Sequence, residues 1–583
     1  MPAVSHKASL LREDDQAPVG LWEGRRDDLV LDRCSSVYLI MMLLGVGSLL
    51  PWNALITPIV YLRLRISGSG FESSFESMFS TIFTWTSFFS VLVLQKLQHH
   101  LSLQLRILGS LGLLLVVFAL LTVLAIVPLA LPEHRLLAEI RAGATLQFTV
   151  LMVCGALCGL GQGILTGSAM AYASIFAQPK YLQAVSGGQG MAGLAVTLGS
   201  MMVSLPGISS VCAGSTDASD QTLDAIGRLG TADSASMESA AAQAPVTLAS
   251  AAGLTASHAH DVISAAAVYF GTSSAVLVLC VVCFGVVECL PFTLARKRMQ
   301  AEASAEAAAG SSASPTIAPC ASQGPPDASQ LPASLPPPPA SASSSGAAAP
   351  QFPPITLESD LSPESAWLAA ASRGDSTLRL LSELWQWALS VCLVYVVTIA
   401  IFPSLTSTII AEPSGNGTGT HQAHSDCEWS HLFGPLGFVI FNLGDTVGRN
   451  LPCVLRNPTA ILTISCARLF FAPLFMLCHT AAGGALQLPN FGGNDVLALL
   501  IIAVFSVSNG WLTSSIFVAS QSAITPDRRD SAASLLVCLL QAGIAIGAAL
   551  SFAVRYLDCS PSAANGFDCN PFVAPPLNVS VAF

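Results

Sequence analysis

Long apolar runs dominate this sequence and restrict what it can fold into. A transmembrane helix needs about 20 predominantly apolar residues, and the 583-residue chain contains many runs of that length. Only 10 % of its residues are charged, whereas soluble domains average about 25 %. The sequence therefore predicts an all-α polytopic membrane protein. We expect eleven transmembrane helices, at about residues 36–60, 77–97, 104–131, 144–177, 182–206, 261–292, 380–411, 431–455, 458–481, 494–523 and 530–557.

The distribution of lysine and arginine indicates how the chain crosses the bilayer. These residues gather in alternate loops, and the strongest cluster is Arg296-Lys-Arg298, just after the sixth run. Because cytoplasmic loops carry the excess of basic residues, we expect the N terminus in the cytoplasm. An odd number of spans then places the C terminus outside, together with the glycosylation sequon at Asn416. Without a targeting signal, the plasma membrane is the expected location.

Two long segments of low complexity divide the chain. Residues 207–260 and 300–365 are rich in Ala and Ser and cannot bury a core, so we expect both to be disordered. The second separates six spans from five, a 6+5 two-bundle, major-facilitator-like arrangement that suits transporters whose halves rock against each other. The expected parts are a cytoplasmic tail (1–35), an N-terminal bundle (36–292), a cytoplasmic linker (293–379), a C-terminal bundle (380–557) and an extracellular tail (558–583).

Asp445 and Arg449 stand four residues apart inside the apolar run 431–455. On a helix this spacing places both side chains on one face. Ionised side chains are costly inside a bilayer, and those that occur there usually face the bundle interior and mark a pathway. In the next span, Arg468 would either pair with Asp445 or reach the cytoplasmic interface, and we favour a structural or gating role for it.

Glycines recur every four residues along the run 144–177, at Gly155, Gly159 and Gly163. They would form a flat ridge on which a neighbouring helix packs closely. Gln162 lies beside this ridge, and its amide needs partners that a polar substrate could supply. A second glycine pattern, Gly188-Gln-Gly-Met-Ala-Gly193, fits the dinucleotide-binding fingerprint. It lies in an apolar helix and does not follow a strand, so we assign it to packing and flexibility.

Prolines interrupt the first span of each expected bundle, at Pro51 and Pro403. Each removes a backbone hydrogen bond and can kink its helix. Paired interruptions of this kind indicate a binding site between the two halves. Trp52 follows Pro51 and offers a flat ring that could stack on a planar ligand. The alternative is a tryptophan of the interfacial belt.

The sequence shows no pattern of catalytic or metal-binding chemistry. It contains no nucleophile–base arrangement, no Cys/His metal spacing, no phosphate loop and no basic stripe with interleaved aromatics. We therefore expect no enzyme activity, no cofactor, no bound metal and no nucleic-acid partner. Four cysteines outside the spans could form disulfides if their side of the membrane is extracellular, in pairs that the sequence leaves open. They are Cys212, Cys427, Cys559 and Cys569.

Several segments, in order along the chain, together resemble the equilibrative nucleoside transporter family. They are Gly45-Val-Gly-Ser-Leu-Leu-Pro-Trp-Asn53, Arg106-Ile-Leu-Gly-Ser110, Ser186-Gly-Gly-Gln-Gly-Met-Ala-Gly193, Asn442-Leu-Gly-Asp-Thr-Val-Gly-Arg449, Arg468-Leu-Phe-Phe-Ala-Pro-Leu474 and Ser508-Asn-Gly510. The resemblance implies a facilitator-type fold that carries purine or pyrimidine nucleosides, and in some members nucleobases. A nucleoside and the lipid bilayer are then the expected partners.

The resemblance also implies which residues meet the nucleoside. Asp445 and Arg449 would meet the ribose hydroxyls. The remaining residues would line the site from several spans: Leu49, Trp52, Asn53, Ile56, Gln162, Phe402, Pro403 and Ile544. Asn442 and Asn509 lie in the matching motifs and share a gating or structural role with Arg468.

The way in which transport is driven stays open between several alternatives. Facilitated diffusion by alternating access is our leading hypothesis, and a proton-coupled symporter with Asp445 as proton acceptor is the main alternative. Arg449 opposes that role because it favours the charged carboxylate. A facilitator-fold carrier of another small solute, and a receptor or channel that binds nucleosides without carrying them, are further alternatives.

Overall fold

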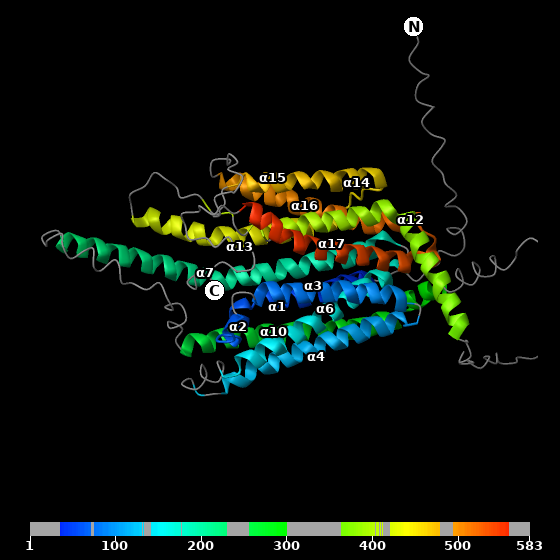
Figure 1. Cartoon of the computed structure of the whole chain (residues 1–583), viewed down its shortest axis with the longest axis horizontal. Coiled ribbons are helices and arrows are strands. Elements are labelled where there is room, and N and C mark those ends of the chain that lie inside the picture. Colours follow the sequence, from blue (N-terminus) through cyan, green and yellow to red (C-terminus); the bar gives the residue numbers. More distant parts are fainter. Residues whose placement is uncertain are drawn as a thin grey trace, which may run out of the picture. The chain divides into compact units, whose positions relative to one another are not determined.

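The structure is a computed structural model in which every described element is a helix (Figure 1). It describes residues 35–229, 256–299, 363–411, 420–478 and 494–558, except for gaps at 72–74, 99, 131, 133–141, 177, 403, 407–408 and 410. The chain divides into two compact units, residues 302–383 and all the rest. The described part of the smaller unit is residues 363–383, which are helical.

The described residues of the first part of the chain form seven helices. They are α1 (Ser36–Ile56), α2 (Ile59–Arg65), α3 (Phe75–Leu97), α4 (Leu103–Leu129), α6 (Ala144–Ser174), α7 (Pro179–Leu229) and α10 (Ala256–Cys289). The second part contains α12 (Pro363–Ile401), α13 (Thr420–Asn450), α14 (Pro458–Ala467), α15 (Phe471–Met476), α16 (Asp495–Ser520) and α17 (Arg529–Asp558). Single turns of 3₁₀-helix occupy Arg468–Phe470, Gln521–Ala523 and Pro526–Arg528.

Nine of the described helical segments are long and apolar enough to cross a membrane. They lie in α1, α3, α4, α6, α10, α12, α14–α15, α16 and α17. Helix α7 covers the span expected at 182–206, and α13 covers the span expected at 431–455 only as far as Asn450; neither is among the nine. In α13 the polar residues Asn442, Asp445 and Arg449 lower the mean hydropathy of the segment.

Several boundaries differ from those expected. Helix α7 continues to Leu229, so the first part of the expected disordered loop 207–260 is helical, and residues 230–255 lie outside the described residues. Helix α12 begins at Pro363, inside the expected linker 293–379, and ends at Ile401. Pro403 follows that end and lies outside the described residues, as do residues 1–34, 300–362 and 559–583.

Pro51 does not end α1. The helix continues through it to Ile56, and the interruption comes at Thr57-Pro58, before α2. Pro51 itself has no backbone N–H to donate. The next backbone N–H, that of Trp52, donates to the side-chain oxygen of Gln162 at 3.1 Å. A side chain on α6 thus satisfies a backbone donor at the proline, where the helical hydrogen-bond pattern is weakened.

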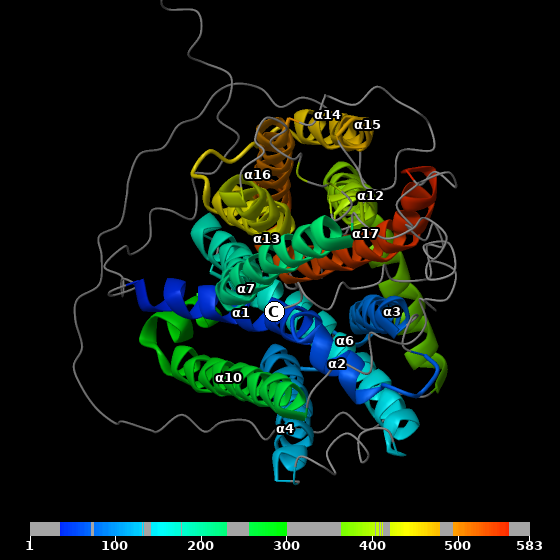
Figure 2. The same ribbon diagram turned by 90° about the vertical axis from the view of Figure 1, so that its left-hand side faces the viewer.

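In the larger unit the helices pack through faces of small residues. Helix α6 packs on α3, and α13 lies between α7 and α16 (Figure 2). A Cβ atom at Gly163 of α6 would lie 2.5 Å from the carbonyl oxygen of Ser87 on α3. A Cβ atom at Gly510 of α16 would lie 2.0 Å from the carbonyl oxygen of Asp445 on α13. Only glycine permits such close contact between helix backbones.

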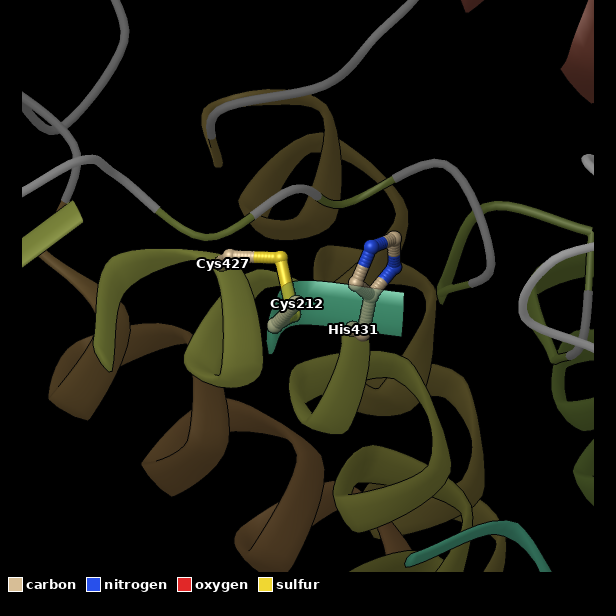
Figure 3. A group of neighbouring side chains, drawn as sticks. All are labelled: Cys212, Cys427 and His431. Atoms are coloured by element: carbon tan, nitrogen blue, oxygen red, sulfur yellow. A yellow bond between two sulfur atoms is a disulfide. The ribbon is translucent and has the colours of Figure 1, made fainter. Parts of the chain in front are cut away.

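A disulfide joins Cys212 of α7 to Cys427 of α13, two residues 215 positions apart in the sequence (Figure 3). The sequence left this pairing open. His431 lies beside the two sulfurs, and the three potential ligand atoms are within 4.8 Å of one another. Metals bind the thiolate form of cysteine, so sulfurs that are bonded to each other do not form a metal site. Cys559 and Cys569 lie outside the described residues.

Candidate functional site

The candidate site is built around the buried ion pair of α13. The four-residue spacing of Asp445 and Arg449 places them one helical turn apart, and the Nε of Arg449 donates to Oδ2 of Asp445 at 2.8 Å. Both residues are at least nine-tenths buried. Inside a membrane, such a pair needs further hydrogen bonds to offset the loss of solvation.

Helix α16 supplies a partner for the other carboxylate oxygen of Asp445. Gly510 allows the two helix backbones to touch, which brings the preceding residue, Asn509, to the pair. The Nδ2 of Asn509 donates to Oδ1 of Asp445 at 2.7 Å. Its Oδ1 accepts a hydrogen bond from the hydroxyl of Thr398 on α12, also at 2.7 Å. Both carboxylate oxygens of Asp445 are therefore engaged.

The guanidinium of Arg449 connects α13 to two other helices. Its NH1 donates to the hydroxyl of Ser186 at 3.1 Å and to Oε1 of Gln189 at 3.2 Å, both on α7. Its NH2 donates to the hydroxyl of Tyr395 on α12 at 3.0 Å. Gln189 in turn donates to the hydroxyl of Ser48 on α1 at 3.2 Å. A continuous set of polar contacts thus runs from α13 through α7 to α1.

Trp52 and Gln162 lie together one helical turn beyond Ser48. They are joined by the hydrogen bond from the Trp52 backbone to the Gln162 side chain. The Trp52 ring is half-buried and tilted by 53° against the ring of Phe83, with 5.0 Å between centroids. The neighbouring Asn53 is buried and donates from Nδ2 to the carbonyl oxygen of Leu49 at 3.3 Å.

The structure distributes the other predicted site residues over several places. Phe402 stacks on Phe441 with 3.7 Å between centroids and borders the hydrophobic cluster that contains Phe441. Ile544 is half-buried on α17, whereas Ile56 at the end of α1 is exposed. Asn442 faces α7, because a Cβ atom at Gly193 would lie 2.2 Å from its Oδ1. Pro403 and Asn416 lie outside the described residues.

The glycine ridge of α6 faces α3. Cβ atoms at Gly155 and Gly159 would lie 2.7 Å from the Phe79 ring and 2.4 Å from the carbonyl oxygen of Phe83, respectively. The GxGxxG segment likewise lies at close helix contacts, since a Cβ atom at Gly188 would lie 1.9 Å from the carbonyl oxygen of Met42 on α1. These positions accommodate neighbouring backbone and side chains.

Arg468 takes neither of the two expected placements. It does not reach an interface, since it is only 1 % exposed. Among the residues that the structure describes, it forms no ion pair with Asp445 or any other acid. Its NH1 donates to the carbonyl oxygen of Phe505 at 2.9 Å and to the hydroxyl of Ser508, and its NH2 donates to the hydroxyl of Thr398 at 2.9 Å.

Sequence reasoning missed five residues of this network. Four of them carry hydroxyls, and the fifth is an amide within the glycine-rich segment of α7: Ser48, Ser186, Gln189, Tyr395 and Thr398. Hydroxyl residues give little signal in an apolar helix, because each can bond a carbonyl of its own helix. Gln189 was the exception, since a buried amide in a span requires partners.

Comparison with known proteins identifies the family. Residues 240–556, more than half of the chain, match the nucleoside transporter family. Equilibrative nucleoside transporter 2 of Homo sapiens is 26 % identical over 565 residues, which cover 91 % of this chain and 99 % of that protein. Equilibrative nucleoside transporter 1 of Rattus norvegicus is 25 % identical over 561 residues, covering 90 % and 98 %.

Among solved structures, the fucose:proton symporter FucP of E. coli covers 89 % of this chain and 98 % of its own, at 12 % identity. The TM-score of 0.35 is too low to support an argument about the fold. The sequence relatives are transporters, in agreement with the expectation that the chain is not an enzyme. On the match over residues 240–556, the chain belongs to the nucleoside transporter family.

Proposed function

We propose that this protein carries nucleosides across a membrane by alternating access, as a facilitated-diffusion carrier. The observation that carries the proposal is the buried Asp445–Arg449 pair, whose contacts reach α7, α12 and α16. The family match gives the class of substrate. Purine nucleosides such as adenosine and inosine are the proposed substrates, with pyrimidine nucleosides and nucleobases as further candidates.

The proposed architecture has eleven spans in a 6+5 arrangement. The nine apolar segments supply five spans before the linker and four after it. Helix α7 would bring the number of spans in the first bundle to six, and α13 would bring the number in the second bundle to five. In this arrangement Arg449 of the second bundle bonds Ser186 and Gln189 of the first, so the polar network lies where the two bundles meet.

The chemistry of the network suits the ribose of a nucleoside. A vicinal diol offers two donors and two acceptors. The Asp445 carboxylate can accept from one hydroxyl while the neighbouring Arg449 guanidinium donates to the other. The Trp52 ring offers a face on which a planar base can stack, and the Gln162 amide is a partner for polar atoms of the base. Leu49, Asn53, Ile56, Phe402, Pro403 and Ile544 are proposed to complete the lining.

The contacts of Asp445 favour passive transport over proton coupling. One oxygen accepts from the Arg449 guanidinium and the other from the Asn509 amide. Binding of a proton here would neutralise the carboxylate and weaken its charge-assisted hydrogen bonds from both donors. We therefore propose facilitated diffusion, with proton-coupled symport as the alternative.

Counterflow in proteoliposomes tests the proposal. Vesicles containing the purified protein are loaded with unlabelled adenosine and diluted into labelled adenosine. We expect a transient accumulation of label that empty vesicles do not show. The absence of counterflow, with binding retained, would indicate a receptor. Accumulation of label in unloaded vesicles under an inward proton gradient would indicate symport. Competition by sugars and not by nucleosides would indicate another solute.

The proposed location is the plasma membrane, with the N terminus in the cytoplasm and the C terminus outside. The basic residues after α10, Arg296-Lys-Arg298, support this orientation. Replacement of Asn416 by Gln should increase the electrophoretic mobility of the protein expressed in a glycosylating cell. After enzymatic removal of the glycans, the wild-type protein and the variant should migrate alike. A wild-type protein that carries no glycan at Asn416 would remove this support.

A further inference from the structure

Arg468 is a buried cation that lacks a direct counter-ion among the described residues. It lies at the start of the 3₁₀ turn between α14 and α15, and its guanidinium carbon is 4.5 Å from the centroid of the Phe505 ring. The aromatic face and the Phe505 carbonyl oxygen offset part of the cost of burial. A charge buried in a membrane protein still needs compensation, and such residues usually have a functional role.

A directed chain of hydrogen bonds leads from Arg468 to Asp445. Arg468 donates to Thr398 at 2.9 Å, Thr398 donates to Oδ1 of Asn509 at 2.7 Å, and Asn509 donates to Asp445 at 2.7 Å. With the Thr398 proton directed to Asn509, and not to the equally near carbonyl oxygen of Val394, each group in the chain donates toward the carboxylate. The hydrogen bonds of such a chain polarise one another inside a protein, so Arg468 and Asp445 are coupled although they do not touch.

Arg468 and Asp445 set the direction of this chain from its two ends. A guanidinium can only donate, so the Thr398 oxygen must accept from it, and its single proton points elsewhere. The acceptors within reach are Oδ1 of Asn509 and the carbonyl oxygen of Val394, each at 2.7 Å. An Asn509 amide with Oδ1 toward Thr398 has its Nδ2 toward Asp445. The reversed amide would place an oxygen against the carboxylate.

We propose that Arg468 is a positioning residue for the substrate site, acting through Thr398 and Asn509 on Asp445. Because it donates to the Thr398 oxygen, it leaves the Thr398 proton for Oδ1 of Asn509 and supports the amide orientation that holds the Asp445 carboxylate where it meets the substrate. This inference rests on the proposed function, because it assumes that Asp445 binds the substrate. A purely structural Arg468 would instead brace α12 and α16 without affecting affinity for the nucleoside.

Substitutions at Thr398 test the relay without touching either charge. Thr398→Val keeps the shape of the side chain and removes the hydroxyl, and we expect KM for adenosine to rise about tenfold, the equivalent of one hydrogen bond to a charged group. Vmax per molecule at the surface should stay within about twofold, since the contact concerns binding. Thr398→Ser restores the hydroxyl and should return KM to the wild-type value.

Ser508 provides a matched control, because it accepts a hydrogen bond from Arg468 but does not lead to Asp445. We expect Ser508→Ala to leave KM unchanged. A double-mutant cycle completes the test: Arg468→Lys should raise KM in the wild type and add little in the Thr398→Val background. If Arg468→Lys fails to reach the membrane, the comparison of Thr398→Val with Thr398→Ser and Ser508→Ala still decides.

Two results would overturn the inference. One is an unchanged KM for Thr398→Val. The other is an effect of Arg468→Lys that has the same size in both backgrounds, which would mean that the two residues act independently. Failure of the proposed function is a separate outcome, because it would appear as a lack of adenosine counterflow in the wild-type protein.

Discussion

Neutralising one member of the buried pair should destabilise the protein strongly. Asp445→Asn keeps the shape of the side chain and one oxygen that can accept from Asn509, so the main loss is the negative charge. Arg449, only 4 % exposed, is then left as a buried cation whose ion-pair partner at 2.8 Å has become neutral. Breaking a buried ion pair in this way costs about 3–5 kcal/mol of the free energy of unfolding. We expect a lower melting temperature of the purified protein and a loss of nucleoside uptake.

The double variant Asp445→Asn/Arg449→Gln separates stability from function. It removes both charges, so no uncompensated ion is buried, and most of the lost stability should return. Uptake per molecule at the cell surface should remain low, because neither side chain can form a charge-assisted hydrogen bond with the ribose hydroxyls. If the double variant also regains transport, the pair is structural. If Asp445→Asn melts at the wild-type temperature, the two charges are not coupled in the way that the contacts indicate.

Two further predictions concern packing. Gly163→Ala places a Cβ atom 2.5 Å from the carbonyl oxygen of Ser87, and this overpacking should cost about 1–3 kcal/mol of the free energy of unfolding. Gly112→Ala, whose Cβ would have no atom within 4 Å, should be neutral or slightly stabilising. Thermal melting of both variants checks this, and equal melting temperatures would contradict it. Cys212→Ser should lower the melting temperature as much as a reductant does, and adding Cys427→Ser should lower it no further. Each of these changes removes the same disulfide, which contributes at most about 5 kcal/mol to the free energy of unfolding. A wild-type melting temperature that is insensitive to reductant would contradict the second prediction.

The helices were predictable from the sequence wherever apolar length alone determines them. The run 104–131 corresponds to α4, Leu103–Leu129. A segment of this apolarity inside a bilayer must satisfy its backbone hydrogen bonds internally, which a helix does. Apolar length does not predict where a helix continues beyond the apolar run. Helix α7 extends to Leu229 through a segment rich in small and polar residues, and its disulfide with Cys427 is a contact between distant positions. Neither feature has a local signal.

The candidate site was predictable only in its local part. The spacing of Asp445 and Arg449 is a property of one helix, and in the structure the two side chains lie on one face of α13 and form an ion pair. The other side-chain partners of Arg449 lie 54 to 263 positions away in the sequence and meet it only through the packing of α7 and α12 on α13. Thr398 illustrates the difficulty, since its hydroxyl also reaches the carbonyl oxygen of Val394 in its own helix. From the sequence, such a threonine cannot be distinguished from one that bonds only its own helix.

The contacts of Arg449 suggest how substrate binding and bundle movement would be linked in the proposed cycle. Its hydrogen bonds to Ser186 and Gln189 join α13 to α7, and they must break if the bundles separate at this point. A ribose hydroxyl bound to Arg449 would replace those acceptors, so the guanidinium would not be left unsatisfied. A ligand shifts a conformational equilibrium only through such a difference in its contacts between states. The nucleoside would therefore lower the energy of the very states in which Arg449 has released α7.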